Sequence, residues 1–151
     1  MATRFAMIQR ESDILQKGLI MRNIPEKYHD LLKDETRAFM ALATIMDNGT
    51  PQNTLVWFNH DDEHLLINSA KGRVKDHNMR QRPEVACLIM DPNDPYRYLQ
   101  VRGRVVEITE EGGLEHINEL NAKYTQRERY PLPEGQVRVI YKIRSESIDG
   151  H

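Results

Sequence analysis

Residues 38–82 carry the clearest structural signals of the chain, and they read AFMALATIMDNGTPQNTLVWFNHDDEHLLINSAKGRVKDHNMRQR. The apolar run at 39–46 ends at Asp47-Asn48-Gly49, and an Asn-Gly pair favours the two positive-φ positions of a type I′ hairpin turn. The β-branched and aromatic residues at 54–58 and the apolar run at 64–69 are typical of strands, with a polar turn between them. This stretch therefore predicts three antiparallel strands.

A cationic segment at residues 71–82 follows the third strand. It holds five Lys or Arg side chains against one carboxylate, and Pro83 ends it. If the segment is a helix, its free amides and positive dipole end lie near Ser69, where Arg73 and Lys75 can converge on an anion such as a phosphate group. The alternative interpretation is a solvated helix whose charges serve only solubility.

The size and charge of the chain limit its domain organisation. It has 151 residues, of which 39% are hydrophobic and 29% charged, and a formal net charge of −2, which does not favour nucleic acid or an anionic membrane as a partner. We predict one domain at residues 24–151 after an extension at residues 1–23. In the extension, Phe5, Ile8, Leu15 and Leu19 form a stripe that indicates either a helix or a partly ordered arm.

The cysteine content and the N-terminus indicate the compartment. Cys87 is the one cysteine, so no intramolecular disulfide can form, and its apolar neighbours predict a buried strand position rather than a nucleophile. Residues 1–21 mix charged with apolar side chains, unlike a signal peptide, and no apolar run approaches the length of a membrane span. These features predict a cytoplasmic protein.

The remaining elements add more β-structure than helix. Residues 25–35 predict a short amphipathic helix, and residues 85–90 a strand. Thr109 is predicted to cap a helix that begins at Glu110 and carries His116 on its surface. A long strand at 96–108 would place on one side Tyr96, Tyr98, Gln100, Arg102 and Arg104, and on the other Leu99, Val101, Gly103 and Val105.

A last strand alternates apolar and cationic residues from Val137 to Arg144. With it, the predicted fold class is mainly β with peripheral helices: a six-stranded antiparallel Greek-key barrel.

Several short motifs follow one another in a specific order, namely Leu42-Ala43-Thr44, Gly49-Thr50-Pro51, Val56-Trp57-Phe58, Leu65-Leu66-Ile67, Lys75-x-x-Asn78-Met79-Arg80, Asp91-Pro92 and Tyr96-Arg97-Tyr98-Leu99-Gln100-Val101-Arg102-Gly103. In these motifs the chain resembles the pyridoxamine 5′-phosphate oxidase-like family of FMN-binding split β-barrels. It resembles more closely the branch of oxidoreductases that depend on the deazaflavin coenzyme F-420. The likeness covers about residues 36–144.

The resemblance implies a six-stranded split barrel that forms a homodimer, with cofactor grooves at the subunit interface. It assigns the cofactor phosphate to Arg73 and Lys75, with Asn68, Ser69 and Asn78 near it. At the edge of the isoalloxazine ring it places Gln52, Asn53, Thr54 and the backbone of Leu55 and Val56. Trp57 packs either near the ring or in the core. Candidates for closing the groove from the partner subunit are Tyr98, Gln100 and Arg102.

The charge of the basic segment favours the deazaflavin over FMN, since Lys71, Arg80 and Arg82 could meet the extra negative charge of the F-420 tail. FMN remains the alternative cofactor. The chain ends without the Arg-containing motif with which pyridoxamine phosphate oxidases hold their substrate, so that activity is not expected. The predicted function is hydride transfer between F-420 and a small, conjugated or unsaturated organic acceptor, in which the ring carries the hydride and no catalytic dyad is needed.

Other function classes have weaker support in the sequence. A non-catalytic carrier of flavin, haem or another tetrapyrrole would use the same barrel, and nucleic-acid binding would use the basic helix. His60 and His64 are four residues apart, but they flank a predicted hairpin loop and do not form the His-Glu-x-x-His pattern of zinc proteases. We therefore predict no metal site.

Overall fold

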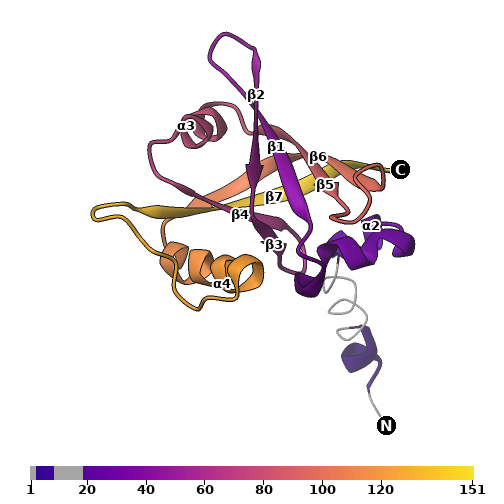
Figure 1. Ribbon diagram of the computed structural model, residues 1–151. Helices are drawn as coiled ribbons and strands as arrows, with labels where there is room; N and C mark the ends of the chain where they lie inside the picture. The colour runs from indigo at the N-terminus through magenta and orange to yellow at the C-terminus, as the bar shows by residue number, and fades with distance from the viewer. Residues whose placement is uncertain (1–2, 9–18) are drawn as a thin grey trace.

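The computed structural model describes residues 3–8 and 19–151 (Figure 1). Its main element is a seven-stranded sheet in which every neighbouring pair is antiparallel. The strands are β1 (Phe39–Ile45), β2 (Pro51–Val56), β3 (Phe58–His60), β4 (Leu65–Ala70), β5 (Glu84–Met90), β6 (Tyr98–Thr109) and β7 (Arg138–Gly150). Besides a helical stretch at residues 4–8, the helices are α2 (Leu19–Asn23), α3 (Val74–Gln81) and α4 (Gly113–Thr125), with two 3-10 helices, η1 (Glu26–Leu32) and η2 (Asp34–Thr36).

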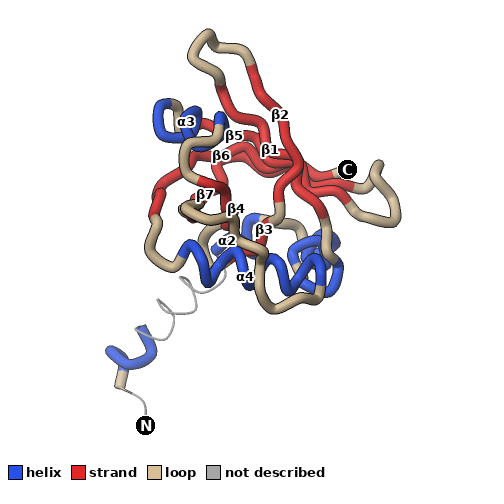
Figure 2. Tube along the Cα trace, turned by 60° about the vertical axis from the view of Figure 1, so that its left-hand side comes forward, coloured by secondary structure: helices blue, strands red, loops and turns tan. Residues whose placement is uncertain are grey.

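The order of the strands explains why the sheet is curled. They lie in the order β2-β1-β5-β6-β7-β4-β3, so β2 and β3 form its two opposite edges. Only Trp57 separates these two strands in the chain, and the two edges must therefore meet at this residue. Figure 2 shows the strands wrapping around a common interior. The mainly β, split-barrel fold that we predicted is confirmed, with seven strands instead of six because Trp57 divides the predicted strand at 54–58.

The β1–β2 turn differs from the predicted type I′ turn. Gly49 has a φ of 83°, but Asn48 is not among the residues with positive φ. The Gly49 amide donates to Met46 O over 2.9 Å, and the Met46 amide donates to Thr50 O over 2.8 Å. The Asn48 side chain instead accepts from the Thr50 amide and hydroxyl. A negative φ at Asn48 leaves its carboxamide free to stabilise the turn locally.

Alternating side chains of the strands fill the interior. On β6 the predicted inner residues Leu99, Val101, Gly103 and Val105 are buried. Cys87 is fully buried on β5, as predicted, and burial raises the pKa of its thiol to about 12. Tyr141 and Phe58 are the largest fully buried side chains of this core. The inward half of each strand thus supplies the hydrophobic driving force that holds the curled sheet together.

Helical segments close the ends of the barrel (Figure 1). The helix predicted at 25–35 is present as η1 and η2, and it buries Tyr28, Leu31 and Leu32. Of the predicted N-terminal stripe, Phe5 and Ile8 are exposed, and Leu15 lies outside the described residues. Helix α2 is anchored by Ile20, which is buried and whose amide donates to Asp62 O.

Several predicted boundaries were wrong. β2 begins at Pro51 rather than Thr54, and β6 begins at Tyr98 rather than Tyr96. The last strand runs on from Arg144 to Gly150, because its C-terminal half continues to pair with β6 as far as Leu99. Helix α4 begins at Gly113 rather than Glu110, because residues 110–112 form a turn in which Gly112 has a φ of 75°. The Thr109 hydroxyl accepts from the Glu111 amide and so stabilises a turn, not a helix cap. The later start moves α4 directly against the first residues of β7.

Candidate functional site

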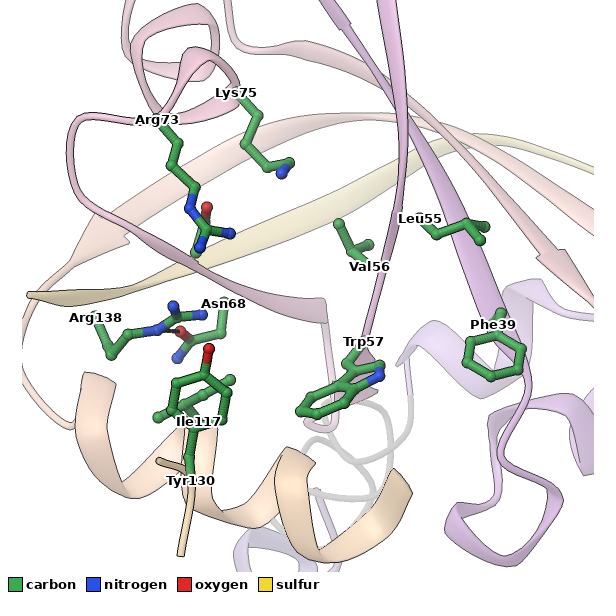
Figure 3. A pocket seen from close by; sticks show the side chains of 11 residues that line it. Phe39, Leu55, Val56, Trp57, Asn68, Arg73, Lys75, Ile117, Tyr130 and Arg138 are labelled. Atoms are coloured by element: carbon green, nitrogen blue, oxygen red, sulfur yellow. Dashed lines mark hydrogen bonds between the residues drawn. The ribbon is translucent and has the colours of Figure 1, made fainter. Parts of the chain in front are cut away.

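A cavity of about 260 Å³ lies where α3, α4 and the edges of the curled sheet come together (Figure 3). Its two ends differ in chemistry. Cationic side chains from α3 and β7 lie at one end, and apolar and aromatic side chains from β1, β2 and the Trp57 junction lie at the other. The lining residues are Phe39, Leu55, Val56, Trp57, Asn68, Ser69, Arg73, Lys75, Ile117, Tyr130 and Arg138.

The cationic end is formed by Arg73, Lys75 and Arg138. Burial, followed by the charges of Arg73 and Arg138, lowers the pKa of the Lys75 ammonium. Among residues 3–8 and 19–151, none of these side chains forms an ion pair with a carboxylate. Like charges that converge without a counter-ion create a positive potential, and an anionic ligand would relieve their repulsion.

The other cations of the basic segment are already paired with carboxylates. Lys71 contacts Glu110 at 2.8 Å, Arg80 contacts Asp76 at 2.9 Å, and Arg82 contacts Asp47 at 2.7 Å. These lysine and arginine side chains do not line the cavity. The structure thus separates Arg73 and Lys75, the predicted phosphate-binding pair, from the other cations of the segment.

Asp76 positions the turn that carries Arg73. Its buried carboxylate accepts hydrogen bonds from the Gly72 amide at 2.9 Å, from Arg80, and from the phenol of Tyr141 on β7. Burial alone would raise the pKa of Asp76, but the bonds from Tyr141, Gly72 and Arg80 together lower it. An ionised Asp76 therefore ties the start of α3 to the barrel core.

Ser69 supplies an unused hydrogen-bonding group at the cationic end. It lies on β4, lines the cavity, and is only 1% exposed. Within the described part of the chain its Oγ has no hydrogen-bond partner. A buried hydroxyl without a partner is costly, so a ligand atom that accepts from it would be stabilised.

The aromatic end is built as a stack of rings. Tyr124 of α4 lies between Phe39, at 5.6 Å, and Trp57, at 5.3 Å, measured between ring centroids. Tyr130 meets Trp57 edge to face at 6.4 Å and has the Arg138 guanidinium over its ring at 5.1 Å. The Tyr124 hydroxyl donates to Ala38 O over 2.6 Å, which fixes the middle ring of the stack. Phe39, Trp57 and Tyr130 thus line the cavity with rings that are held in place by one another and by Tyr124.

A buried polar chain lies behind Arg138. Arg138 Nε donates to Asn68 Oδ1 over 2.8 Å, and Asn68 Nδ2 faces both Gly113 O at 2.9 Å and His116 Nδ1 at 3.1 Å. His116 Nε2 lies 2.8 Å from Asn59 Oδ1. The prediction that His116 lies on the surface is therefore wrong: it is 5% exposed, because α4 packs against the barrel by this face.

Gly113 makes this close packing possible. A Cβ atom at this position would lie 2.1 Å from Arg138 O, a distance that no side chain can accept. The glycine lets the first turn of α4 approach the first residue of β7, and its carbonyl accepts from Asn68. Gly113 is thus required by the packing, whereas Gly112 is favoured by its backbone conformation, with a φ of 75°.

The structure brings some predicted site residues together and leaves others outside the cavity. Six of them line it, namely Leu55, Val56, Asn68, Ser69, Arg73 and Lys75, and Trp57 joins them. Gln52, Asn53 and Thr54 lie further along β2. The buried Asn78 carboxamide donates to Thr44 Oγ1 over 3.0 Å and faces away from the lining residues. Its contacts hold α3 on β1.

Tyr98, Gln100 and Arg102 lie on the outward side of β6, away from the cavity of the same chain. Tyr98 stacks on His151, and Arg102 donates to Ser147. Their predicted role in a partner's groove stays a prediction.

Sequence reasoning missed Phe39, Ile117, Tyr130 and Arg138 as site residues. Arg138 was assigned to the polar side of the last strand, yet it is 6% exposed. Its pairing with Ala70, three residues before Arg73, places it at the cavity. This strand register cannot be read from a single sequence. A usable signal is that Arg138 begins the strand that follows the loop at residues 130–135.

The histidines singled out in the sequence do not form a metal site. His64 Nδ1 contacts Asp61 at 3.2 Å, and His60 contacts the Asp61 carbonyl. In the described ranges, no group of three or more His, Cys, Asp or Glu side chains is arranged to hold a metal ion. Within the same ranges, no helix combines the length and the apolar character needed to cross a membrane.

Comparison with known proteins gives the family of the chain. The family model described as pyridoxamine 5′-phosphate oxidase matches residues 24–150. A search among curated proteins gave no match. A solved structure named F420 reductase has 35% sequence identity and a TM-score of 0.74, and the match covers 83% of this chain and 98% of that one.

More distant solved structures share the fold alone. The conserved hypothetical protein Rv2991 from Mycobacterium tuberculosis has 22% identity and a TM-score of 0.63, with 84% of each chain covered. General Stress Protein 26 from Bacillus anthracis has 20% identity and a TM-score of 0.57, with 80% of this chain and 91% of that one covered. The family model matches most of the chain, and the curled seven-stranded sheet fits it. The chain therefore belongs to the pyridoxamine 5′-phosphate oxidase-like family of split β-barrels.

Proposed function

We propose that this protein is an oxidoreductase that uses the deazaflavin coenzyme F-420 for hydride transfer to a small, conjugated or unsaturated organic acceptor. The observation that carries the proposal is the two-ended cavity, with aromatic side chains at one end and Arg73, Lys75 and Arg138, which form no ion pair within the described residues, at the other. Coenzyme F-420 has a matching division between a phosphodiester tail and a planar ring. The 35% identical F420 reductase supports the same cofactor.

The residues of the cavity fit this cofactor in specific ways. Arg73, Lys75 and Arg138 would hold the phosphate group, and the Ser69 hydroxyl, which lacks a partner among the described residues, would donate to one of its oxygens. Leu55, Val56 and Trp57 would hold the ring and exclude water from it. When bound, the deazaflavin ring supplies the hydride, which leaves binding, orientation and shielding to the protein.

The proposed assembly is a homodimer with cofactor sites at the subunit interface. The cavity is open along Phe39 and Leu55, which are 43% and 67% exposed. Large apolar side chains exposed beside a ligand cavity favour a site completed by another surface. In a dimer, Tyr98 and Gln100 of the partner subunit would lie over the cofactor ring.

FMN is the second candidate cofactor, because the cationic end would accept its phosphate monoester equally well. Lys71, Arg80 and Arg82 were expected to favour the longer tail of F-420, but they are engaged by carboxylates. This weakens the charge argument for the deazaflavin and leaves the likeness to the F420 reductase as its main support. A non-catalytic carrier of flavin or tetrapyrrole would bind without turnover.

Titration of cofactor-stripped protein tests the proposal directly. Oxidised and reduced F-420, FMN and haem are added separately, and binding is followed by absorbance and fluorescence. Tight binding of F-420 with weak binding of FMN supports the deazaflavin, and subsequent oxidation of reduced F-420 by conjugated acceptors supports the enzyme. Preferential binding of FMN or haem, or F-420 binding without turnover of any acceptor, contradicts it.

A further inference from the structure

The polar chain behind the cationic end has only one consistent arrangement of hydrogens. Arg138 Nε can only donate and Gly113 O can only accept, so their contacts with Asn68 fix the orientation of its carboxamide. Asn68 Nδ2 then directs its second hydrogen at His116 Nδ1, 3.1 Å away. Nδ1 must accept, so the hydrogen of a neutral imidazole lies on Nε2, which donates to Asn59.

Through these hydrogen bonds His116 is connected to the cavity, although it does not contact the cavity itself. His116 is not among the lining residues, whereas Asn68 and Arg138 are. The Arg138 side chain is held at two points, by Asn68 through Nε and by Gln136 through Nη1 at 2.9 Å. If the Asn68 carboxamide were flipped, an N–H donor would face the guanidinium, and the hydrogen bond from Arg138 Nε would be lost.

We propose that His116 is a positioning residue for anion binding: together with Gly113 O, its neutral Nδ1 accepts from Asn68 and holds the carboxamide in place, and Asn68 in turn holds Arg138 toward the cavity. The proposal rests on the proposed function in one respect, namely that the anion is the phosphate group of the cofactor. The chain of contacts joins α4, β4 and β7, so the helix that covers the cavity also sets its electrostatics.

If His116 had a purely structural role, its variants would change ligand binding in a different way. Pairs of matched ligands distinguish the structural role from the positioning role. FMN and riboflavin share a ring and differ by the phosphate, and F-420 differs from its riboflavin-like core by the phosphodiester tail. Loss of packing around His116 would weaken both members of each pair equally. Misplacement of Arg138 would weaken only the member that carries the phosphate.

The variants test individual contacts of the imidazole. His116→Asn places an oxygen near the position of Nδ1 and keeps the acceptor for Asn68, whereas His116→Phe keeps an aromatic ring but removes the acceptor. Asn121→Ala is the matched control, because Asn121 is buried on the same helix and donates to Arg127 O, outside the polar chain. Each variant is titrated with all four ligands, and its melting temperature is recorded.

We expect His116→Phe to bind the phosphate-bearing ligands about tenfold more weakly, since a charged hydrogen bond is misplaced, while riboflavin and the F-420 core are unchanged. His116→Asn restores most of the difference, and Asn121→Ala lowers the melting temperature without changing any binding ratio. Equal losses for both members of each pair in His116→Phe would overturn the proposal. So would a failure of His116→Asn to restore the ratio.

Inorganic phosphate separates this inference from the cofactor assignment. Wild-type protein should be stabilised against heat by millimolar phosphate, and His116→Phe should lose this stabilisation, whichever flavin is the natural cofactor. If phosphate has the same effect on both proteins, the positioning role is wrong even where F-420 binds. A long-range ¹H–¹⁵N spectrum that shows the proton on Nδ1 of His116 would also exclude it.

Discussion

The indole of Trp57 lies parallel to the phenol ring of Tyr124, with 5.3 Å between ring centroids and 8° between ring planes. Trp57 is the one tryptophan of the chain, it joins the two edges of the sheet, and it lines the cavity. Its fluorescence therefore reports directly on the site. We expect FMN, riboflavin and F-420 each to quench it on binding.

Replacement of this ring should affect the ring of the ligand and not its phosphate. Trp57→Ala is expected to weaken FMN and riboflavin by the same factor, about three- to tenfold, because an aromatic contact is lost. Flavin fluorescence measures both constants. Tyr96→Ala is the control, since Tyr96 is 81% exposed and outside the cavity. A larger loss for FMN than for riboflavin would place Trp57 at the phosphate instead.

Arg73 and Lys75 should act together at the other end. The double variant Arg73→Ala/Lys75→Ala is expected to weaken FMN and F-420 at least about a hundredfold, since two charge-assisted contacts are removed, and to reduce the salt dependence of binding. Circular dichroism should show unchanged secondary structure, because neither side chain forms an ion pair within the described residues.

The control for this variant removes the same kind of charge elsewhere. Lys142→Ala breaks a pair with Glu107 on the long β6–β7 ribbon, away from the cavity, and should leave both affinities unchanged. Riboflavin binding by the double variant should also stay near that of wild type. Unchanged FMN and F-420 affinity in the double variant would remove the phosphate site altogether.

The sequence predicted the fold well because inward and outward residues alternate on most strands. Leu99, Val101 and Val105 could be assigned to the core of β6 from their spacing alone. The division at Trp57 could not be predicted, because residues 54–58 are all strand formers and the break comes from closure of the sheet. The missed start of α4 has a similar cause, since it depends on the contact of Gly113 with β7.

The site was predictable only where its residues are close in sequence. Ser69, Arg73 and Lys75 lie within one turn and helix start, so their convergence follows from local geometry. Arg138 reaches them through the register of β4 with β7, and Asn78 turns away because Thr44 offers its carboxamide a buried partner. Both outcomes depend on tertiary pairing, which overrides the local pattern.

Asp76 should make the protein sensitive to acid. The folded state lowers the pKa of this carboxyl, so its stabilisation is present above the unfolded pKa of about 3.9 and is lost as pH falls through the lower folded value. Asp76→Asn is expected to lower the free energy of unfolding at pH 7 by about 2–3 kcal/mol, because the bonds from Arg80 and Tyr141 lose their charged acceptor. Urea denaturation at pH 7 and pH 3 measures both effects.

The acid sensitivity of Asp76→Asn should be smaller than that of wild type. Asp62→Asn is the control, since Asp62 is exposed, and its side chain should contribute little at either pH. An equal loss of stability in both variants would show that Asp76 does not hold the start of α3.

His116 should act in a different pH window. Burial, followed by the charge of Arg138, lowers its pKa to about 4, so the folded state favours the neutral imidazole. Between the unfolded value of about 6.5 and this folded value, the unfolded chain binds more protons, and stability must fall as the pH is lowered. The slope approaches about 1.4 kcal/mol per pH unit for one such group.

His116→Asn cannot titrate and should lose this slope, whereas His77→Asn, at an exposed position on α3, should keep it. Urea denaturation at pH 7, 6 and 5 measures the free energy of unfolding of each protein. If this free energy fell equally with pH in wild type and His116→Asn, the imidazole would be protonated in the folded state, which the hydrogen bond from Asn68 does not allow.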